Sequence, residues 1–273
     1  FAKFWVDKHL SLDGVNYFFN ILEKGEFASI AWSRRFTEYL TEWPLVFAVK
    51  VGIANVDLLI DVFALGVYFP YLLSFALCIY AIRDGDKSLL WFPLAGYLGF
   101  NVLSDYNMIA DHHVLAVMTW PILLIMMKTR PLQWLEGCVL WLLLIVYSRM
   151  YETAILTAGI LSLIVMARIY LYRSQREQII MWFSLLLLIV VVYIGVQYII
   201  DPRSPQNRGA FIDSLWVNQR NWEAITSSSF LMLIGIGWLI NTCRPRLKNI
   251  AFIMALMPIG IYAYLRLSDP DYT

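Results

Sequence analysis

Long hydrophobic stretches recur along this chain and constrain its fold more than any other feature of the sequence. A helix that crosses a bilayer needs about 17 to 25 consecutive, mostly apolar residues. We therefore expect an all-α fold, a polytopic transmembrane helical bundle of roughly eight spans, with a re-entrant element within 89–147 as the alternative to three clean crossings there. The candidate spans are 56–82, 89–103, 113–127, 134–147, 153–172, 179–200, 228–240 and 250–267.

The composition supports the same class of protein. Hydrophobic residues make up 60% of the chain and charged residues 15%, whereas soluble domains are about 45–50% apolar. The formal net charge of +1 argues against a nucleic-acid partner, because no basic face remains once the loop charges are assigned to topology. The sequence also contains no nucleotide-binding glycine loop, Gly-x-Ser-x-Gly elbow or His-Glu-x-x-His helix, so the common soluble enzyme classes have no support.

The first 43 residues mix aromatic and charged residues and read as a surface segment rather than a span. Residues 12–23 have apolar side chains at helical spacing, and Gly25 is typical of a helix end. Residues 35–43 predict a second short helix that Pro44 ends. Because the sequence begins at Phe1, we expect a processed or partial chain with an upstream span. The predicted domains are an extracytoplasmic amphipathic segment at 1–43 and a transmembrane domain at 44–273 with a long outside loop at 201–225.

Basic residues in the connections predict the orientation of the spans. If the segment before Val56 is outside, every short inside connection carries at least two lysines or arginines, which satisfies the positive-inside rule. We therefore expect an integral protein of a bacterial inner (plasma) membrane whose functional face is extracytoplasmic. The inside cations are Arg83 and Lys87, Lys128 and Arg130, Arg173 and Arg176, and Arg244, Arg246 and Lys248.

The outer side collects acidic, histidine, amide and tyrosine residues. They lie in the N-terminal segment and in the connections 104–112, 148–152 and 201–225. Arg149 and the arginines of 201–225 are the exceptions to the positive-inside pattern. We expect these connections to converge on one polar cavity that faces outward.

A series of acidic, basic, aromatic, glycine and proline residues precedes the first long apolar stretch, namely Asp13, Gly14, Tyr17, Gly25, Arg34, Arg35, Tyr39 and Pro44. This series resembles the first extracytoplasmic loop of the GT-C superfamily of membrane glycosyltransferases, over residues 1–80 and in the general layout. The resemblance implies an enzyme that uses a polyprenyl-phosphate-linked sugar, with Asp13 as the base or the group that positions the acceptor. The paired acidic motif often seen in that loop is missing here.

The chemistry of such a transfer can be stated from the residues. A carboxylate must take a proton from the acceptor hydroxyl, and cations must neutralise the leaving phosphate. Arginine suits the second task because it binds phosphate in a bidentate manner. We expect Asp13 to be catalytic, and membrane lipid and a polyprenyl-linked substrate to be partners. The expected substrate-binding residues are Arg34, Arg35, Tyr39, Arg149, Glu152 and Arg220.

Most of these residues also have a structural interpretation. Asp13 would cap a helix that begins at Gly14. Arg34 and Arg35 would extend to lipid headgroups. Arg149 and Glu152, three residues apart, would form an ordinary helix pair.

A divalent metal is the expected cofactor if there is one, with Asp105, Asp111, His112 and His113 as the candidate ligands. Histidine and carboxylate suit zinc or manganese. Adjacent residues of a helix point about 100° apart, so His112 and His113 share an ion only if the backbone leaves the helix. The alternative is that these groups bind one another and water at the membrane edge.

Two other functions compete with glycosyl transfer. The first is a non-catalytic accessory or structural subunit of a membrane protein complex, whose tryptophans and phenylalanines contact lipid and other membrane subunits. The second is a transporter, which would place polar groups at the bilayer midplane and show an internal repeat. The polar residues gather at the edges instead and no repeat is found, so the transporter ranks third.

Overall fold

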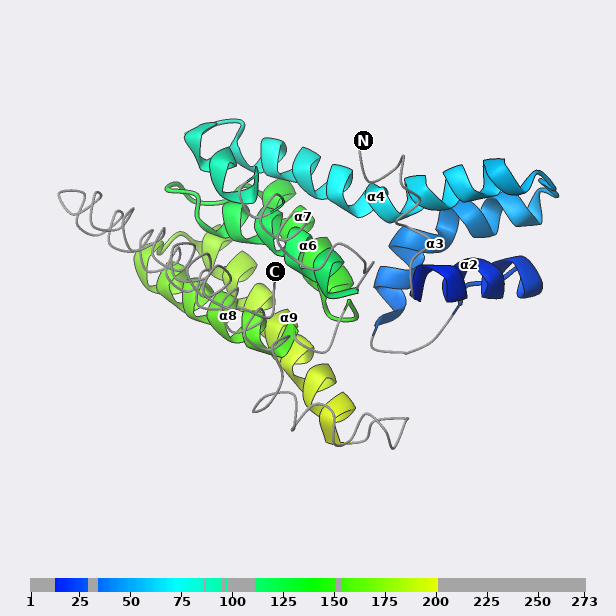
Figure 1. The fold of residues 1–273 in the computed structure, drawn as a ribbon. Coiled ribbons are helices and arrows are strands. Elements are labelled where there is room, and N and C mark those ends of the chain that lie inside the picture. The colour runs from blue at the N-terminus through cyan, green and yellow to red at the C-terminus, as the bar shows by residue number, and fades with distance from the viewer. Residues whose placement is uncertain are drawn as a thin grey trace, which may run out of the picture. The chain divides into compact units, whose positions relative to one another are not determined.

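A computed structural model gives the fold (Figure 1). The structure describes residues 13–28, 34–85, 87–94, 97, 111–150 and 154–200. These residues form seven α-helices and a short 3-10 helix, and no strand occurs among them. The all-α prediction is therefore confirmed for this part of the chain. The first compact unit consists of Phe1–Ile125 and Leu135–Ala154, and the second of Met126–Trp134 and Ile155–Thr273.

Helix α2 spans Asp13–Lys24, and Gly25 ends it as predicted. Gly25 has a φ of +65°, in the left-handed region that favours glycine, and its N–H donates to the Ile21 carbonyl at 2.8 Å. Phe18 and Ile21, on the apolar face of α2, are buried against residues of the next two helices such as Leu45 and Phe63. This face of the N-terminal segment is therefore covered by protein.

Helix α3 spans Arg35–Lys50 and contains Pro44 in its interior. The prediction that Pro44 ends this helix was wrong, and the predicted domain boundary between residues 43 and 44 falls within α3. An interior proline removes one helical hydrogen bond, which costs about 3 kcal/mol in isolation. In this fold Leu45 and Val46 are buried in the core of the first unit, and tertiary packing of this kind can outweigh the local penalty.

Helix α4 spans Val56–Ile82, with the bounds predicted from its hydrophobic length. Asn55 caps it, because its side-chain oxygen accepts from the Leu58 N–H at 3.2 Å. Helices α3 and α4 run side by side, with α2 beside α3 (Figure 1). At Gly66 a Cβ atom would clash with the Thr41 carbonyl and lie 3.1 Å from the Pro44 ring. The missing side chain of Gly66 therefore sets how closely α4 approaches α3.

The remaining α-helices follow the predicted apolar stretches, whereas the short η3 lies at the start of the predicted span 89–103, most of which is outside the described residues. They are η3 at Lys87–Leu90, α6 at Asp111–Met126, α7 at Trp134–Tyr147, α8 at Ala154–Leu171 and α9 at Gln175–Ile200. Within the first unit, the Ser74 hydroxyl of α4 donates to the Val117 carbonyl of α6. The Thr119 hydroxyl of α6 lies 2.9 Å from the Tyr147 hydroxyl of α7. Polar contacts between apolar helices of this kind are typical of membrane helix packing.

Two helices, α4 and α9, are long and apolar enough to cross a membrane, with mean hydropathies of 2.1 and 2.8. Only 39% and 33% of their most apolar windows are buried, which is less than for the core helix of a soluble protein. The apolar parts of α6, α7 and α8 are shorter. The fourteen residues of α7 extend about 21 Å against a hydrocarbon core of about 30 Å. The predicted spans 228–240 and 250–267 lie outside the described residues.

Candidate functional site

Four buried polar residues lie on one face of α3. Thr37, Glu38, Thr41 and Glu42 are each 8% exposed or less. Their spacing of one, four and five residues places them on the same side of a helix with 3.6 residues per turn. A buried carboxylate is costly unless hydrogen bonds or charges compensate it, so this face is built around polar contacts. We call these four residues the α3 polar face.

The α3 polar face connects three segments of the first unit. Glu42 Oε2 accepts from the Ala28 N–H at 2.8 Å, which ties the segment after α2 to the helix. The Thr37 hydroxyl donates to the Met150 carbonyl at 2.8 Å. The Thr41 hydroxyl donates to the Thr37 carbonyl at 2.9 Å. These contacts hold the beginning of α3 against residues 148–150, the corner that follows α7.

The corner also supplies a hydrogen-bond acceptor for the N-terminus of α3. The first N–H groups of a helix have no partner within the helix. Arg34, the N-cap residue, makes no side-chain capping bond. The Phe36 N–H instead donates to the Arg149 carbonyl at 3.1 Å. Two segments more than a hundred residues apart in the sequence are therefore joined through their backbones.

Three of the predicted phosphate-binding residues come from these two segments. Arg34 is half-buried and Arg35 exposed at the start of α3, and Arg149 is half-buried in the corner. Arginines of this kind supply the charge and planar donors that a phosphate group binds. Tyr39 lies one turn further along α3, where its ring contacts Phe27 with centroids 4.7 Å apart. That contact gives Tyr39 a packing role as well as the predicted substrate-binding role.

The other predicted site residues are described in part or not at all. Asp13 is the first residue of α2, and its side chain lies outside the described part of the chain. Asp111, His112 and His113 begin α6, and their side chains are likewise outside. Glu152, Arg220 and Asp105 lie outside the described residues altogether.

The metal prediction therefore stays a prediction. Among the described residues, no three or more histidine, cysteine, aspartate or glutamate side chains form a group that could hold a metal ion. The backbone at His112 and His113 is helical. The sequence predicted a shared ion for these two residues only if the backbone left the helix.

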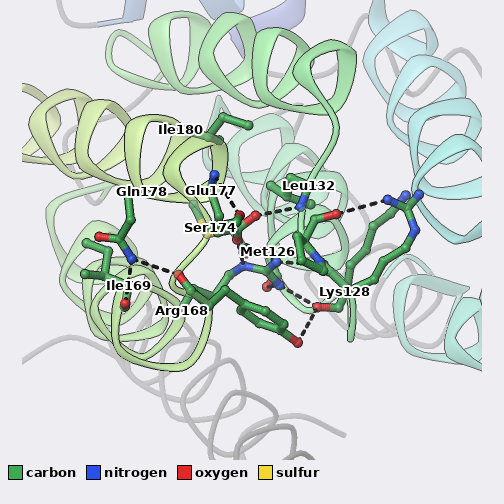
Figure 2. Close-up of polar contacts among 12 residues, drawn as sticks. Met126, Lys128, Leu132, Arg168, Ile169, Ser174, Glu177, Gln178 and Ile180 are labelled. Carbon is green, nitrogen blue, oxygen red and sulfur yellow. Dashed lines mark hydrogen bonds and ion pairs between the residues drawn. The ribbon is translucent and has the colours of Figure 1, made fainter.

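A second buried polar cluster, which the sequence analysis missed, lies in the second unit (Figure 2). The Arg168 side chain of α8 is completely buried, and so is that of Glu177 in the first turn of α9. Arg168 Nε donates to Glu177 Oε1 at 2.7 Å. Arg168 Nη2 lies 2.7 Å from the same oxygen. Glu177 Oε2 in turn accepts from the Leu132 N–H at 2.6 Å. We call Arg168 and Glu177 the buried ion pair.

The rest of the Arg168 guanidinium binds backbone carbonyls near the end of α6. Nη1 donates to Met126 at 2.7 Å and to Lys128, and Nη2 donates to Arg130 at 3.0 Å. Figure 2 shows Arg168 between Glu177 and the chain at Met126 and Lys128. A guanidinium has five N–H groups, and these contacts use all of them. The buried ion pair therefore fastens residues 126–132 to the α8–α9 hairpin and has no donor left for a ligand.

The local sequence around the ion pair predicts a different contact for Glu177. Ser174 and Glu177 have the spacing of a capping box, in which the glutamate returns to the N–H of the cap residue. One half forms, since the Glu177 N–H donates to the Ser174 hydroxyl at 3.3 Å. Gln178 closes the other side of the turn by donating to the Ile169 and Tyr172 carbonyls, each at 2.8 Å. The sequence signal that could have revealed the ion pair is Arg168 itself, because an arginine within an apolar helix needs a partner for its charge.

Comparison with known proteins gave no match. No family model, curated protein or solved structure is significantly similar to this chain. The function is therefore argued from the residues and contacts of the chain.

Proposed function

We propose that this chain is an integral membrane protein of the GT-C type that transfers a sugar from a polyprenyl-phosphate donor at the extracytoplasmic face of a bacterial inner membrane. Its transmembrane part would be a bundle of roughly eight spans. The observation that carries the proposal is the pair of hydrogen bonds from Phe36 and Thr37 to residues 149–150. The basic residues of the other connections assign both of these segments to the outer side.

The proposed roles follow from the chemistry of each group. Asp13 accepts the proton of the acceptor hydroxyl, whose oxygen then attacks the anomeric carbon while the sugar–phosphate bond breaks toward the phosphate. Arg34, Arg35 and Arg149 neutralise the leaving phosphate. Tyr39, Glu152 and Arg220 complete the substrate-binding set. No step depends on a metal, although Asp105, Asp111 and one of the two histidines remain the proposed ligands for a divalent ion.

The α3 polar face supports this arrangement by positioning the N-terminal segment. Glu42 holds the segment after α2 through the Ala28 N–H, and Thr37 holds the corner that contains Arg149. Rigid support of this kind matters because catalysis depends on the placement of groups to within a fraction of an ångström. Thr37 and Glu42 are thus positioning residues in this proposal.

Substitution of Asp13 tests the proposal. The full chain is purified, reconstituted in liposomes and supplied with labelled polyprenyl-phosphate sugars and candidate acceptors. Because general base catalysis contributes about 10²–10⁴-fold to a rate, Asp13→Asn should lower turnover at least about 100-fold with the thermal midpoint unchanged. Glu23→Gln is the matched control, since Glu23 is an exposed carboxylate on the same helix, and it should keep full turnover.

The opposite results have distinct meanings. A variant Asp13→Asn that keeps its turnover would show that Asp13 does no chemistry, and it would keep its thermal midpoint even if Asp13 caps α2, because asparagine caps a helix as well as aspartate does. A wild-type chain that transfers no sugar from any polyprenyl-phosphate donor would end the enzyme proposal. Arg149→Gln extends the test, because loss of a phosphate contact should raise the KM for the donor.

An accessory subunit is the second candidate, and a feature of α4 favours it. Four exposed residues repeat at intervals of seven along this helix, which is the spacing of a seam that packs against another helix. They are Leu58, Leu65, Leu72 and Ile79. Lipid would cover the same stripe in a protein that acts alone. Co-purification of a stoichiometric partner that Leu65→Ser and Leu72→Ser release would favour the subunit.

A further inference from the structure

The buried ion pair gathers the basic residues of two connections at one end of the second unit. Residues 126–134 and 168–178 contain five basic side chains and one acidic one. Because Glu177 neutralises Arg168, the net charge of these segments resides on the other four. These are Lys128, Arg130, Arg173 and Arg176, which we call the basic patch.

The contacts around Arg168 fix the backbone of the connection that carries two of these cations. The Lys128 and Arg130 carbonyls both accept from its guanidinium, so residues 128–130 cannot leave the end of α8. Arg173 follows α8 directly and Arg176 lies in the first turn of α9. Both of these arginines are exposed. The contacts of Arg168 and Glu177 therefore hold together the two connections that carry the patch.

Helix stability does not account for Arg176, the member of the patch in the first turn of α9. A cation in the first turn of a helix, such as Arg176, faces the positive end of the helix dipole and is unfavourable there. Anions are favoured at the same place, because the first N–H groups and the dipole both attract negative charge. The beginning of α9 thus adds to the attraction that the four side chains exert on an anion.

Exposed aromatic residues lie close in sequence to the basic patch. Trp134 begins α7, Tyr170 lies in the last turn of α8 and Trp182 in the second turn of α9, and all three are largely exposed. Tryptophan and tyrosine are enriched where a membrane helix passes the headgroup region. Cations and amphipathic aromatic rings at the same end of two apolar helices match the surface of an anionic bilayer.

We propose that the basic patch binds the phosphate headgroups of anionic membrane lipids. The proposal rests on the membrane location of the chain and not on glycosyl transfer. Each lysine or arginine near an anionic bilayer surface contributes to such binding. Arg173 and Arg176 should carry much of the preference, because both are exposed whereas Lys128 and Arg130 are half-buried.

Native mass spectrometry of the purified full chain tests the proposal, with phosphatidylglycerol and phosphatidylcholine offered together in detergent. Wild type should retain phosphatidylglycerol preferentially. The double variant Arg173→Gln/Arg176→Gln should reduce that preference about 30-fold, which corresponds to about 1 kcal/mol for each cation removed. Each single variant should give an intermediate value and serves as the readout if the double variant fails to fold.

The matched control is Lys24→Gln/Lys50→Gln, which removes two exposed lysines from the part of the chain before Val56 that is predicted to lie on the opposite side. Its lipid preference should stay within about twofold of wild type, since screening confines each charge to its surroundings. Equal loss in both double variants, or no loss in either, would overturn the proposal. Displacement of the lipid by excess inorganic phosphate would also overturn it, in favour of a site for free phosphate. Because the assay measures no sugar transfer, its result is independent of the proposed enzyme activity.

Discussion

Replacement of Arg168 by leucine should destabilise the second unit more than any substitution of an exposed residue in the same connections. The change removes every hydrogen bond of the guanidinium and leaves Glu177 fully buried, with the Leu132 N–H donating to its carboxylate at 2.6 Å. Removal of one partner from a buried ion pair costs about 3–5 kcal/mol, because the remaining charge is uncompensated. Since whole domains are stable by about 5–15 kcal/mol, this is a large share of the total.

The double variant Arg168→Leu/Glu177→Leu separates charge from hydrogen bonding. It removes both buried charges and leaves the Leu132 N–H and three carbonyls to find other partners. An unsatisfied buried polar group costs about 1–3 kcal/mol, but Lys128 is only half-buried, so water can reach part of this connection. The double variant should therefore lose less stability than the sum of the two single variants, by at least about 2 kcal/mol.

The measurement is unfolding of the purified chain in a titration with denaturing detergent, followed by circular dichroism. Arg173→Leu is the control, because Arg173 is an exposed arginine only five residues away, and it should change the free energy of unfolding by less than about 0.5 kcal/mol. An Arg168→Leu variant as stable as the control would refute the reasoning. So would strictly additive effects of the two single variants, because they would mean that the two side chains do not interact.

Two further predictions concern the first unit. Gly66→Ala should lower the thermal midpoint, because its Cβ would clash with the backbone of α3. The control is Gly159→Ala on α8 of the second unit, where an added Cβ meets open space. It should be neutral or stabilising by about 0.5–1 kcal/mol in the same melt. Equal effects of the two substitutions would show that α3 and α4 are not in close contact at Gly66. Thr37→Val should cost about 1 kcal/mol of unfolding free energy through its lost hydrogen bond to the corner after α7, and an unchanged midpoint would argue against that junction.

Features set by local sequence were predicted well. The bounds of α4 follow from a long, mostly apolar stretch. Gly25 ends α2 because its backbone adopts a positive φ. In each case the information lies within a few residues of the feature, so no knowledge of distant partners is needed.

Features set by distant partners were not predicted. Pro44 stays within α3 because the residues around it pack into a core with α4, and this core cannot be seen in the proline itself. The Leu132–Glu177 bond joins residues 45 apart, and nothing in the capping-box spacing of Ser174 and Glu177 specifies it. Of the candidate site, the sequence anticipated that the N-terminal segment and the 148–152 connection lie together, but not that Thr37 joins them.

The arginines of this chain show why a charged residue in an apolar sequence needs its donors counted before it is given a role. A charge inside a membrane helix is by default a functional hypothesis, and Arg168 fits that rule until its five N–H groups are traced to Glu177 and three carbonyls. With no donor left, Arg168 can only be structural. Arg35, Arg173 and Arg176 are exposed, so their guanidinium groups are accessible to a phosphate group. The ability to bind an anion therefore lies in the exposed arginines at the helix ends. Arg168, which is completely buried, instead holds in place the α8–α9 connection that carries Arg173 and Arg176.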